Sequence, residues 1–136
     1  MKLFTCLLLA SLFWLSSIGT SAKSAESTEY HGYLIDRACM KAVQSSVNPL
    51  DFVFHHTKDC VLMPDCKKYG FCLYLHKERQ WLNLDAIGNK QAEEVIRKSK
   101  RNSAFFVLIK GRKEAGELKV KSIQEVKIDP KASRGE

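Results

Sequence analysis

The stretch that decides the fold is FCLYLHKERQWLNL, residues 71–84. In an extended chain the odd-numbered residues from Phe71 to Leu75 fall on one face, and the even-numbered residues from Cys72 to His76 fall on the other. Residues 77–80 form a polar turn, and residues 81–84 are again mostly apolar. This pattern predicts a β-hairpin and, with it, a mainly β domain.

The segments on either side of this hairpin predict three more strands and one helix. YHGYLID, residues 30–36, reads as a first strand with a bend or bulge at Gly32. After the hairpin, Asn89 is expected to cap a helix that runs to about Arg101. The other expected segments are a buried strand at residues 104–109, a turn at 111–117 and a long strand at 118–128 that is either buried on both faces or bulged near Ser122.

Five strands with one helix between the third and the fourth are the order of an OB-fold. We therefore predict an OB-fold-like five-stranded β-barrel with one helix and a Cys/His-rich insertion after strand 1. A closed barrel leaves few exposed strand edges, which suits this apolar content. The alternative is an open antiparallel sheet with one helix packed across it.

The N-terminal residues predict an exported protein. Residues 1–22 resemble a signal peptide, because Lys2 precedes an apolar core and Thr20, Ser21 and Ala22 offer a cleavage site. The apolar run is shorter than the ~20 residues that a membrane span needs, although an uncleaved anchor is the alternative. We expect a secreted or periplasmic protein without a transmembrane helix after cleavage. Its parts would be a disordered leader at 23–29, a single OB-like domain at 30–128 and a polar tail at 129–136.

The chain carries a net charge of +7 at pH 7. For an exported protein, this charge favours an anionic envelope or extracellular partner such as phospholipid, cell-wall polymer or acidic glycan, and not nucleic acid. A well-solvated surface without any such partner is the simpler explanation.

Residues 39–72 hold four of the five cysteines and two of the four histidines, and they allow three interpretations. An even number of cysteines in a small exported domain is typical of disulfide bonds, here between Cys39 and the 60–72 segment. A disulfide-stabilised binding or adaptor module for an anionic partner would follow. A Cys60–His56 nucleophilic pair would make a thiol enzyme, but no oxyanion loop follows and export favours oxidation, so we predict a protein that is not an enzyme.

The third interpretation is a transition-metal site. A short helix is expected over residues 52–58, with Asp51 as its cap. His56 and Cys60 are four residues apart, so if both lie on one helical turn, their side chains point the same way and would share one ion. Cys66 returns after a turn at Pro64, and Cys39 follows the first strand. Three thiolates and one imidazole suit tetrahedral Zn²⁺, and the sulfur donors also suit Cu(I).

Several residues are weaker candidates for the same region. Cys72 and His55 are candidates for a disulfide or for an accessory ligand. Asp36 is expected to hold the bend after the first strand or to act as an isolated ligand. In OB-folds the second and third strands and the adjoining loops form the usual binding face, which here would hold Tyr74, Trp81, Arg112 and Lys113.

From residue 31 to residue 126 the chain resembles a group of small exported bacterial proteins with OB-like cores and no settled activity. The matching motifs are GYLID followed by Cys39, HTKDCVLM at residues 56–63 followed by Cys66, and DAIGN at residues 85–89. The resemblance implies export and an OB-like fold. Members of the group tend to have glycine where Cys72 stands, which implies the ligand set Cys39, His56, Cys60 and Cys66.

Overall fold

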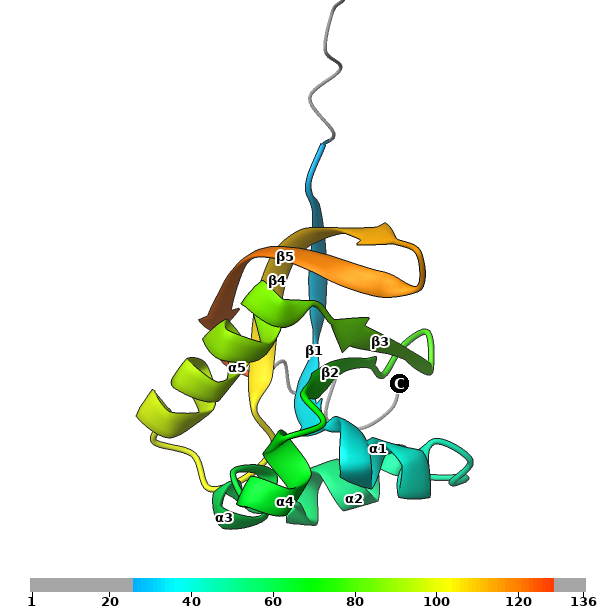
Figure 1. The fold of residues 1–136 in the computed structure, drawn as a ribbon. Helices are drawn as coiled ribbons and strands as arrows, with labels where there is room; N and C mark the ends of the chain where they lie inside the picture. Colours follow the sequence, from blue (N-terminus) through cyan, green and yellow to red (C-terminus); the bar gives the residue numbers. More distant parts are fainter. Residues whose placement is uncertain (1–25, 129–136) are drawn as a thin grey trace, which may run out of the picture.

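A computed structural model describes residues 26–128 (Figure 1). The predicted signal peptide, the start of the leader and the polar tail at 129–136 lie outside these residues. In chain order the elements are β1 (Thr28–Asp36), α1 (Arg37–Val43), α2 (Pro49–His55), α3 (Lys58–Val61), α4 (Pro64–Lys67), β2 (Phe71–Leu75), β3 (Gln80–Leu84), α5 (Ala86–Lys98), β4 (Phe106–Glu114) and β5 (Glu117–Glu125).

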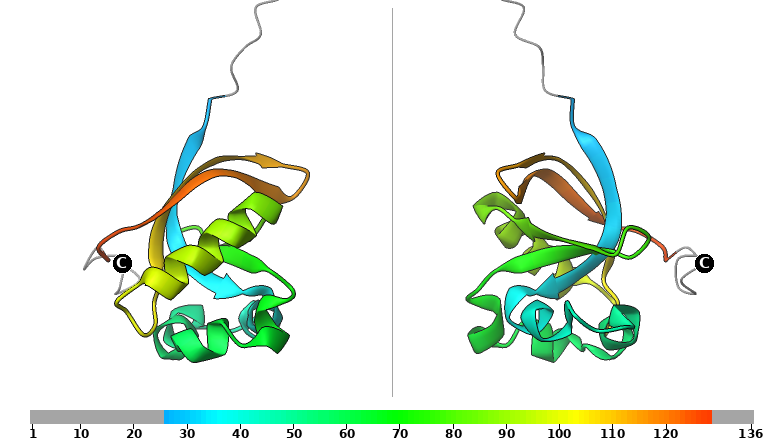
Figure 2. Two further views of the ribbon diagram at one scale, coloured as in Figure 1. Left: turned by 60° about the vertical axis from the view of Figure 1, so that its left-hand side comes forward. Right: turned by 90° about the vertical axis from the view of Figure 1, so that its right-hand side faces the viewer.

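The strands form one mixed sheet, which confirms the mainly β prediction. They pair in the order β1-β2-β3-β5-β4, and β4 pairs again with β1, so the sheet closes on itself as a barrel. Neighbouring strands are antiparallel except β3 and β5, which are parallel. The four short helices α1–α4 gather at the end of the barrel where β1 finishes, and α5 lies against β5 (Figures 1 and 2).

The interior of the barrel is an apolar cluster to which every strand contributes. Leu34, Leu73 and Val107 are among its fully buried side chains. From α5, Ala92 and Ile96 complete this core, as expected for the narrow apolar face of that helix. This burial is the main source of stability for the fold.

A second apolar cluster lies on the other face of β1 and β2. Tyr33 and Tyr74 project from these strands toward Met40 of α1 and Val53 of α2. The two faces of β2 therefore belong to different cores, which explains why all its residues are buried. The helical insertion covers a sheet face that would otherwise be in contact with water.

The predicted hairpin and its alternation are confirmed. β2 pairs with β3, and its odd-numbered and even-numbered residues face the two different cores. The expected irregularity near Ser122 is also confirmed, because the β4–β5 register shifts between Lys110 and Gly111 and leaves Lys121 without a partner.

Several predicted boundaries were wrong. β1 begins at Thr28, so Thr28 and Glu29 belong to the domain and not to the leader. The β1–β4 register runs through Gly32 without a shift. An added Cβ at Gly32 would lie 2.4 Å from the carbonyl oxygen of Tyr74, so close strand approach and not a bulge requires glycine there. The predicted turn at 111–117 is mostly strand, with the reversal at Ala115 and Gly116, both at positive φ.

The helices differ from prediction at their caps. Asp85 caps α5 by accepting a hydrogen bond from the amide of Gly88 at 2.8 Å, whereas the side chain of Asn89 accepts from the amide of Phe71. α5 ends at Lys98 and not near Arg101. The helix predicted over 52–58 begins instead at Pro49 and ends at His55, which places Asp51 inside its first turn.

We expect the substitution Asp85→Ala to lower the free energy of unfolding by about 1 kcal/mol, because the first turn of α5 loses its capping acceptor. Asp65→Ala is the matched control, since Asp65 lies in the first turn of α4 and bonds only the exposed Lys68 in the side-chain contacts that the structure records. Its effect should stay within about 0.5 kcal/mol. Urea unfolding measures both, and equal effects would contradict the assignment of Asp85 as the cap.

Candidate metal site

Asp36 stands where the barrel ends and the insertion begins, and its side chain is fully buried. Its Oδ1 accepts a hydrogen bond from the amide of Cys39 at 2.8 Å and so caps α1. Its Oδ2 lies 2.7 Å from Nε2 of His56. One carboxylate therefore holds both the first helix of the insertion and a residue twenty positions further along the chain.

Asp36, Cys39 and Cys66 bring three metal-binding atoms together. A carboxylate oxygen and the two sulfur atoms all lie within 4.8 Å of one another. In residues 26–128, no other set of three or more His, Cys, Asp or Glu side chains meets this condition. Asp36 is buried, and both cysteines are half-buried.

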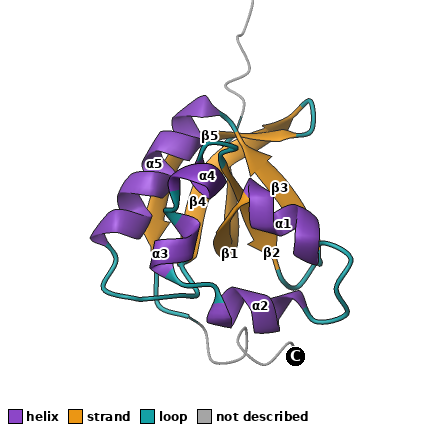
Figure 3. Cartoon of the chain, turned by 60° about the horizontal axis from the view of Figure 1, so that its bottom comes forward, coloured by secondary structure: helices purple, strands orange, loops and turns teal. Residues whose placement is uncertain are grey.

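The local sequence explains why these atoms converge. The cap by Asp36 starts α1 and puts Cys39 at its third position, within reach of the carboxylate. Pro64 occupies the first position of α4, where its missing N–H costs nothing, and Cys66 is the third residue of that helix. α1 and α4 pack together, and the amide of Arg37 donates to the carbonyl of Gly70 at 2.9 Å (Figure 3).

The surroundings of the cluster shift the pKa values of Asp36 and Cys39 in opposite directions. Burial and the neighbouring Asp36 carboxylate and Cys66 thiol raise the pKa of Cys39 to about 12. Burial also acts to raise the pKa of Asp36, but the hydrogen bonds from His56 and from the Cys39 amide outweigh it and lower that pKa. Asp36 is thus a carboxylate beside a protonated thiol, and a metal ion would replace the thiol proton.

The predicted His56–Cys60 ligand pair rested on a single helical turn, and this premise was wrong. His56 follows α2 with extended backbone angles (φ −77°, ψ 102°), and Thr57 then caps the separate helix α3. The His56 ring stacks on Phe52 at 4.7 Å between centroids and bonds Asp36. Of the predicted ligands, the structure brings Cys39 and Cys66 together, and His56 joins them only through Asp36.

The remaining sulfur and imidazole candidates lie outside the cluster. Cys60 is exposed on α3, and Cys72 is buried on β2, where its thiol donates to the carbonyl of Ile35 at 3.5 Å. The exposed His55 ring lies 2.7 Å from the carbonyl oxygen of Asp51. All four cysteines of the described residues are free thiols, so the expected disulfide is not formed in this structure.

The ligand-binding face predicted from the OB-fold is largely occupied by the protein itself. Tyr74 is only 2% exposed and stacks on Trp81 with 4.3 Å between ring centroids, within the core that the insertion covers. Arg112 pairs with Glu114, whereas Lys113 bonds Gln80 beside Trp81. Because adjacent residues of a strand project to opposite faces, Arg112 and Lys113 do not extend one common surface.

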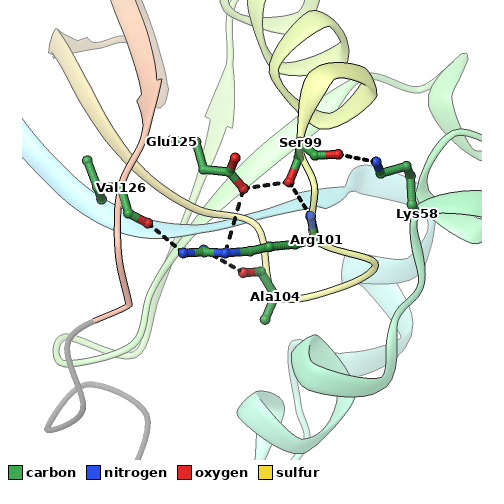
Figure 4. A network of polar contacts seen from close by, with 6 residues as sticks. All are labelled: Lys58, Ser99, Arg101, Ala104, Glu125 and Val126. Atoms are coloured by element: carbon green, nitrogen blue, oxygen red, sulfur yellow. Dashed lines mark hydrogen bonds and ion pairs between the residues drawn. The ribbon is translucent and has the colours of Figure 1, made fainter.

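Lys58 ties the insertion to the far side of the barrel. Its amide donates to the carbonyl of Asn102 at 2.6 Å, and its ammonium group donates to the carbonyl of Ser99. The Ser99 hydroxyl in turn donates to Glu125 at 2.6 Å. Figure 4 shows how this network continues through the guanidinium group of Arg101 to Ala104, Glu125 and Val126.

Asp36 is the site residue to which sequence reasoning gave too little weight. It was expected to hold a bend or to act alone, whereas it joins Cys39, Cys66 and His56. The signal was present in the order Asp36-x-x-Cys39, because an N-cap carboxylate comes close to the residue three positions later. No sequence pattern indicated that α4 would bring Cys66 to the same place.

Comparison of the chain with protein-family models, with curated proteins and with solved structures found no match. None of the helices in the described part of the chain has the length and apolar character that crossing a bilayer requires.

We expect His56→Ala to lower the free energy of unfolding by about 3 kcal/mol, because it leaves the buried Asp36 carboxylate without its side-chain partner. The neighbouring His55→Ala is the matched control, since the His55 side chain is 79% exposed, and its effect should stay within about 0.5 kcal/mol. Both are measured by urea unfolding with a chelator present, so that metal loss does not contribute. Equal effects would contradict the structural role of His56.

Proposed function

We propose that this protein is an exported OB-like, non-enzymatic protein that binds one transition-metal ion, Zn²⁺ or Cu(I), through Asp36, Cys39 and Cys66. The observation that carries the proposal is the convergence of two sulfur atoms and a carboxylate oxygen within 4.8 Å on three different elements. Thiolate and carboxylate oxygen are both established ligands of Zn²⁺, and paired thiolates also suit Cu(I).

The surroundings of the cluster support a metal-binding role. In metal sites the residues behind the ligands fix their orientation, and His56 does this for Asp36 by bonding the oxygen that does not cap α1. The raised pKa of Cys39 argues against a reactive thiolate at this cysteine in the metal-free protein.

The order in which the strands and α5 are connected supports the OB-like assignment. The order β1-β2-β3-β5-β4, with α5 between β3 and β4, is what an OB-fold would give, and the insertion follows the first strand. Export, into the periplasm or out of the cell, is inferred from the signal-like residues 1–22.

The second candidate function is that of a disulfide-stabilised adaptor for an anionic envelope or extracellular partner. The observation in its favour is that the sulfur atoms of Cys39 and Cys66 are already neighbours, although a disulfide requires them at about 2.05 Å. An oxidising compartment would favour this bond. The positive net charge, +7 for the full chain and one unit lower without Lys2, is what would attract the anionic partner.

Metal analysis of the mature chain, purified without a polyhistidine tag and loaded under reducing conditions, tests the proposal. We expect one equivalent of ion in the wild type and in Cys60→Ser, and a loss of most of the bound ion in Cys39→Ser and Cys66→Ser. Cys60→Ser is the matched control because Cys60 lies in the same insertion but outside the cluster.

Two results would decide against metal binding. The first is substoichiometric metal in the wild type that none of the three substitutions changes. The second is a non-reduced protein that is two hydrogens lighter by intact mass, with Cys39 and Cys66 linked in one peptide pair, and that gains no metal after reduction. The second result would favour the adaptor.

A further inference from the structure

Sulfur-bearing side chains lead from the surface of the insertion to the Asp36–Cys39–Cys66 cluster. Cys60, Met63 and Cys66 follow one another at intervals of three residues on α3, at the junction of the two helices and on α4. Cys60 is exposed, Met63 is 48% exposed and Cys66 is half-buried. Cys60 and Met63 therefore lie at the surface, whereas Cys66, which belongs to the cluster, is less exposed.

Backbone hydrogen bonds fix the relative positions of Cys60, Met63 and Cys66. The amide of Met63 donates to the carbonyl of Cys60 at 3.1 Å, and the amide of Cys66 donates to the carbonyl of Met63 at 2.9 Å. Two consecutive tight turns thus hold the three residues near one another. The helices themselves are held in place by the Lys58 contacts to Ser99 and Asn102.

Met63 is placed differently from the other methionine of the domain. Met40 is buried in the second core, as is usual for this residue type. A single exposed methionine needs no explanation by itself. Met63 lies between Cys60 and Cys66 in the chain, and Cys66 belongs to the Asp36–Cys39–Cys66 cluster. Its thioether is therefore a candidate ligand for an ion on its way to that cluster.

The donor types favour one of the two candidate ions. Thiolate is a ligand of both Cu(I) and Zn²⁺, whereas the softer thioether suits Cu(I) better than Zn²⁺. Zn²⁺ in closed structural sites takes four protein ligands, whereas the cluster offers three. Cu(I) accepts low coordination numbers, so the two thiolates of Cys39 and Cys66 are sufficient for it.

We propose that Cu(I) is the ion of this site, and that Cys60 and Met63 receive it at the surface and pass it to Cys66 and Cys39. This inference rests on the proposed metal-binding function and adds the identity of the ion and its route. At each transfer one copper–sulfur bond forms while another breaks. Copper remains Cu(I) throughout, and the protons of the Cys39 and Cys66 thiols pass to the solvent.

The route is tested by the rate at which the reduced mature protein takes Cu(I) from its bicinchoninate complex, followed in a stopped-flow absorbance experiment. In the double variant Cys60→Ser/Met63→Leu we expect a rate at least about tenfold lower than in the wild type, with the same copper content at equilibrium. Met40→Leu is the control, because it removes the buried thioether next to Cys39 with little change of volume, and its rate should equal that of the wild type.

The possible results separate the two proposals. If the double variant takes copper as fast as the wild type and to the same content, the route is wrong and the metal site stands. If the double variant loses copper at equilibrium, Cys60 and Met63 are ligands and the transfer role is wrong. A wild type that binds Zn²⁺ but not Cu(I) overturns the copper assignment alone, whereas a wild type that binds neither ion overturns the metal-binding function itself.

Discussion

The buried carboxylate of Asp36 is the constraint on which the insertion depends. Removing a charge from water costs several kcal/mol unless the group is paired and hydrogen-bonded. Asp36 meets this requirement with the amide of Cys39 on one oxygen and with His56 on the other. The first contact begins α1, and the second fixes the chain between α2 and α3. A single residue at the end of β1 thus sets the course of the chain through most of the insertion.

The helices of the insertion could not form without such contacts. α3 and α4 have four residues each, far below the length of about 12–15 residues at which isolated helices become even marginally stable. Three consecutive residues supply the stabilising contacts that the helix propensity of such short segments cannot supply. His56 bonds Asp36, Thr57 caps α3, and Lys58 bonds the loop after α5. In this structure the His-Thr-Lys segment is therefore a set of structural contacts around the cluster.

The sequence was informative where one physical rule acted alone. Alternation from Phe71 to Leu75 predicted β2 correctly, because each face of a strand meets a separate environment and both environments here are apolar. Prediction failed where two residues competed for one role. Asp85 and Asn89 are both good helix caps. The structure shows that Asp85 begins α5 by accepting from the Gly88 amide, whereas the Asn89 side chain accepts from the Phe71 amide. The spacing of His56 and Cys60 was read as one helical turn, although Thr57 is itself a capping residue that starts a new helix.

The position of the cluster follows from the way in which the insertion covers one face of the barrel. By covering β1 and β2 with Met40, Val53 and their neighbours, it turns one face of the sheet into a second core. The Asp36–Cys39–Cys66 cluster lies instead where the helices meet the barrel, because its residues come from the end of β1, from α1 and from α4. An ion bound there would join the first and last helices of the insertion to the barrel. Because such an ion binds the folded chain and not the unfolded one, its affinity would appear directly as stability of this layer.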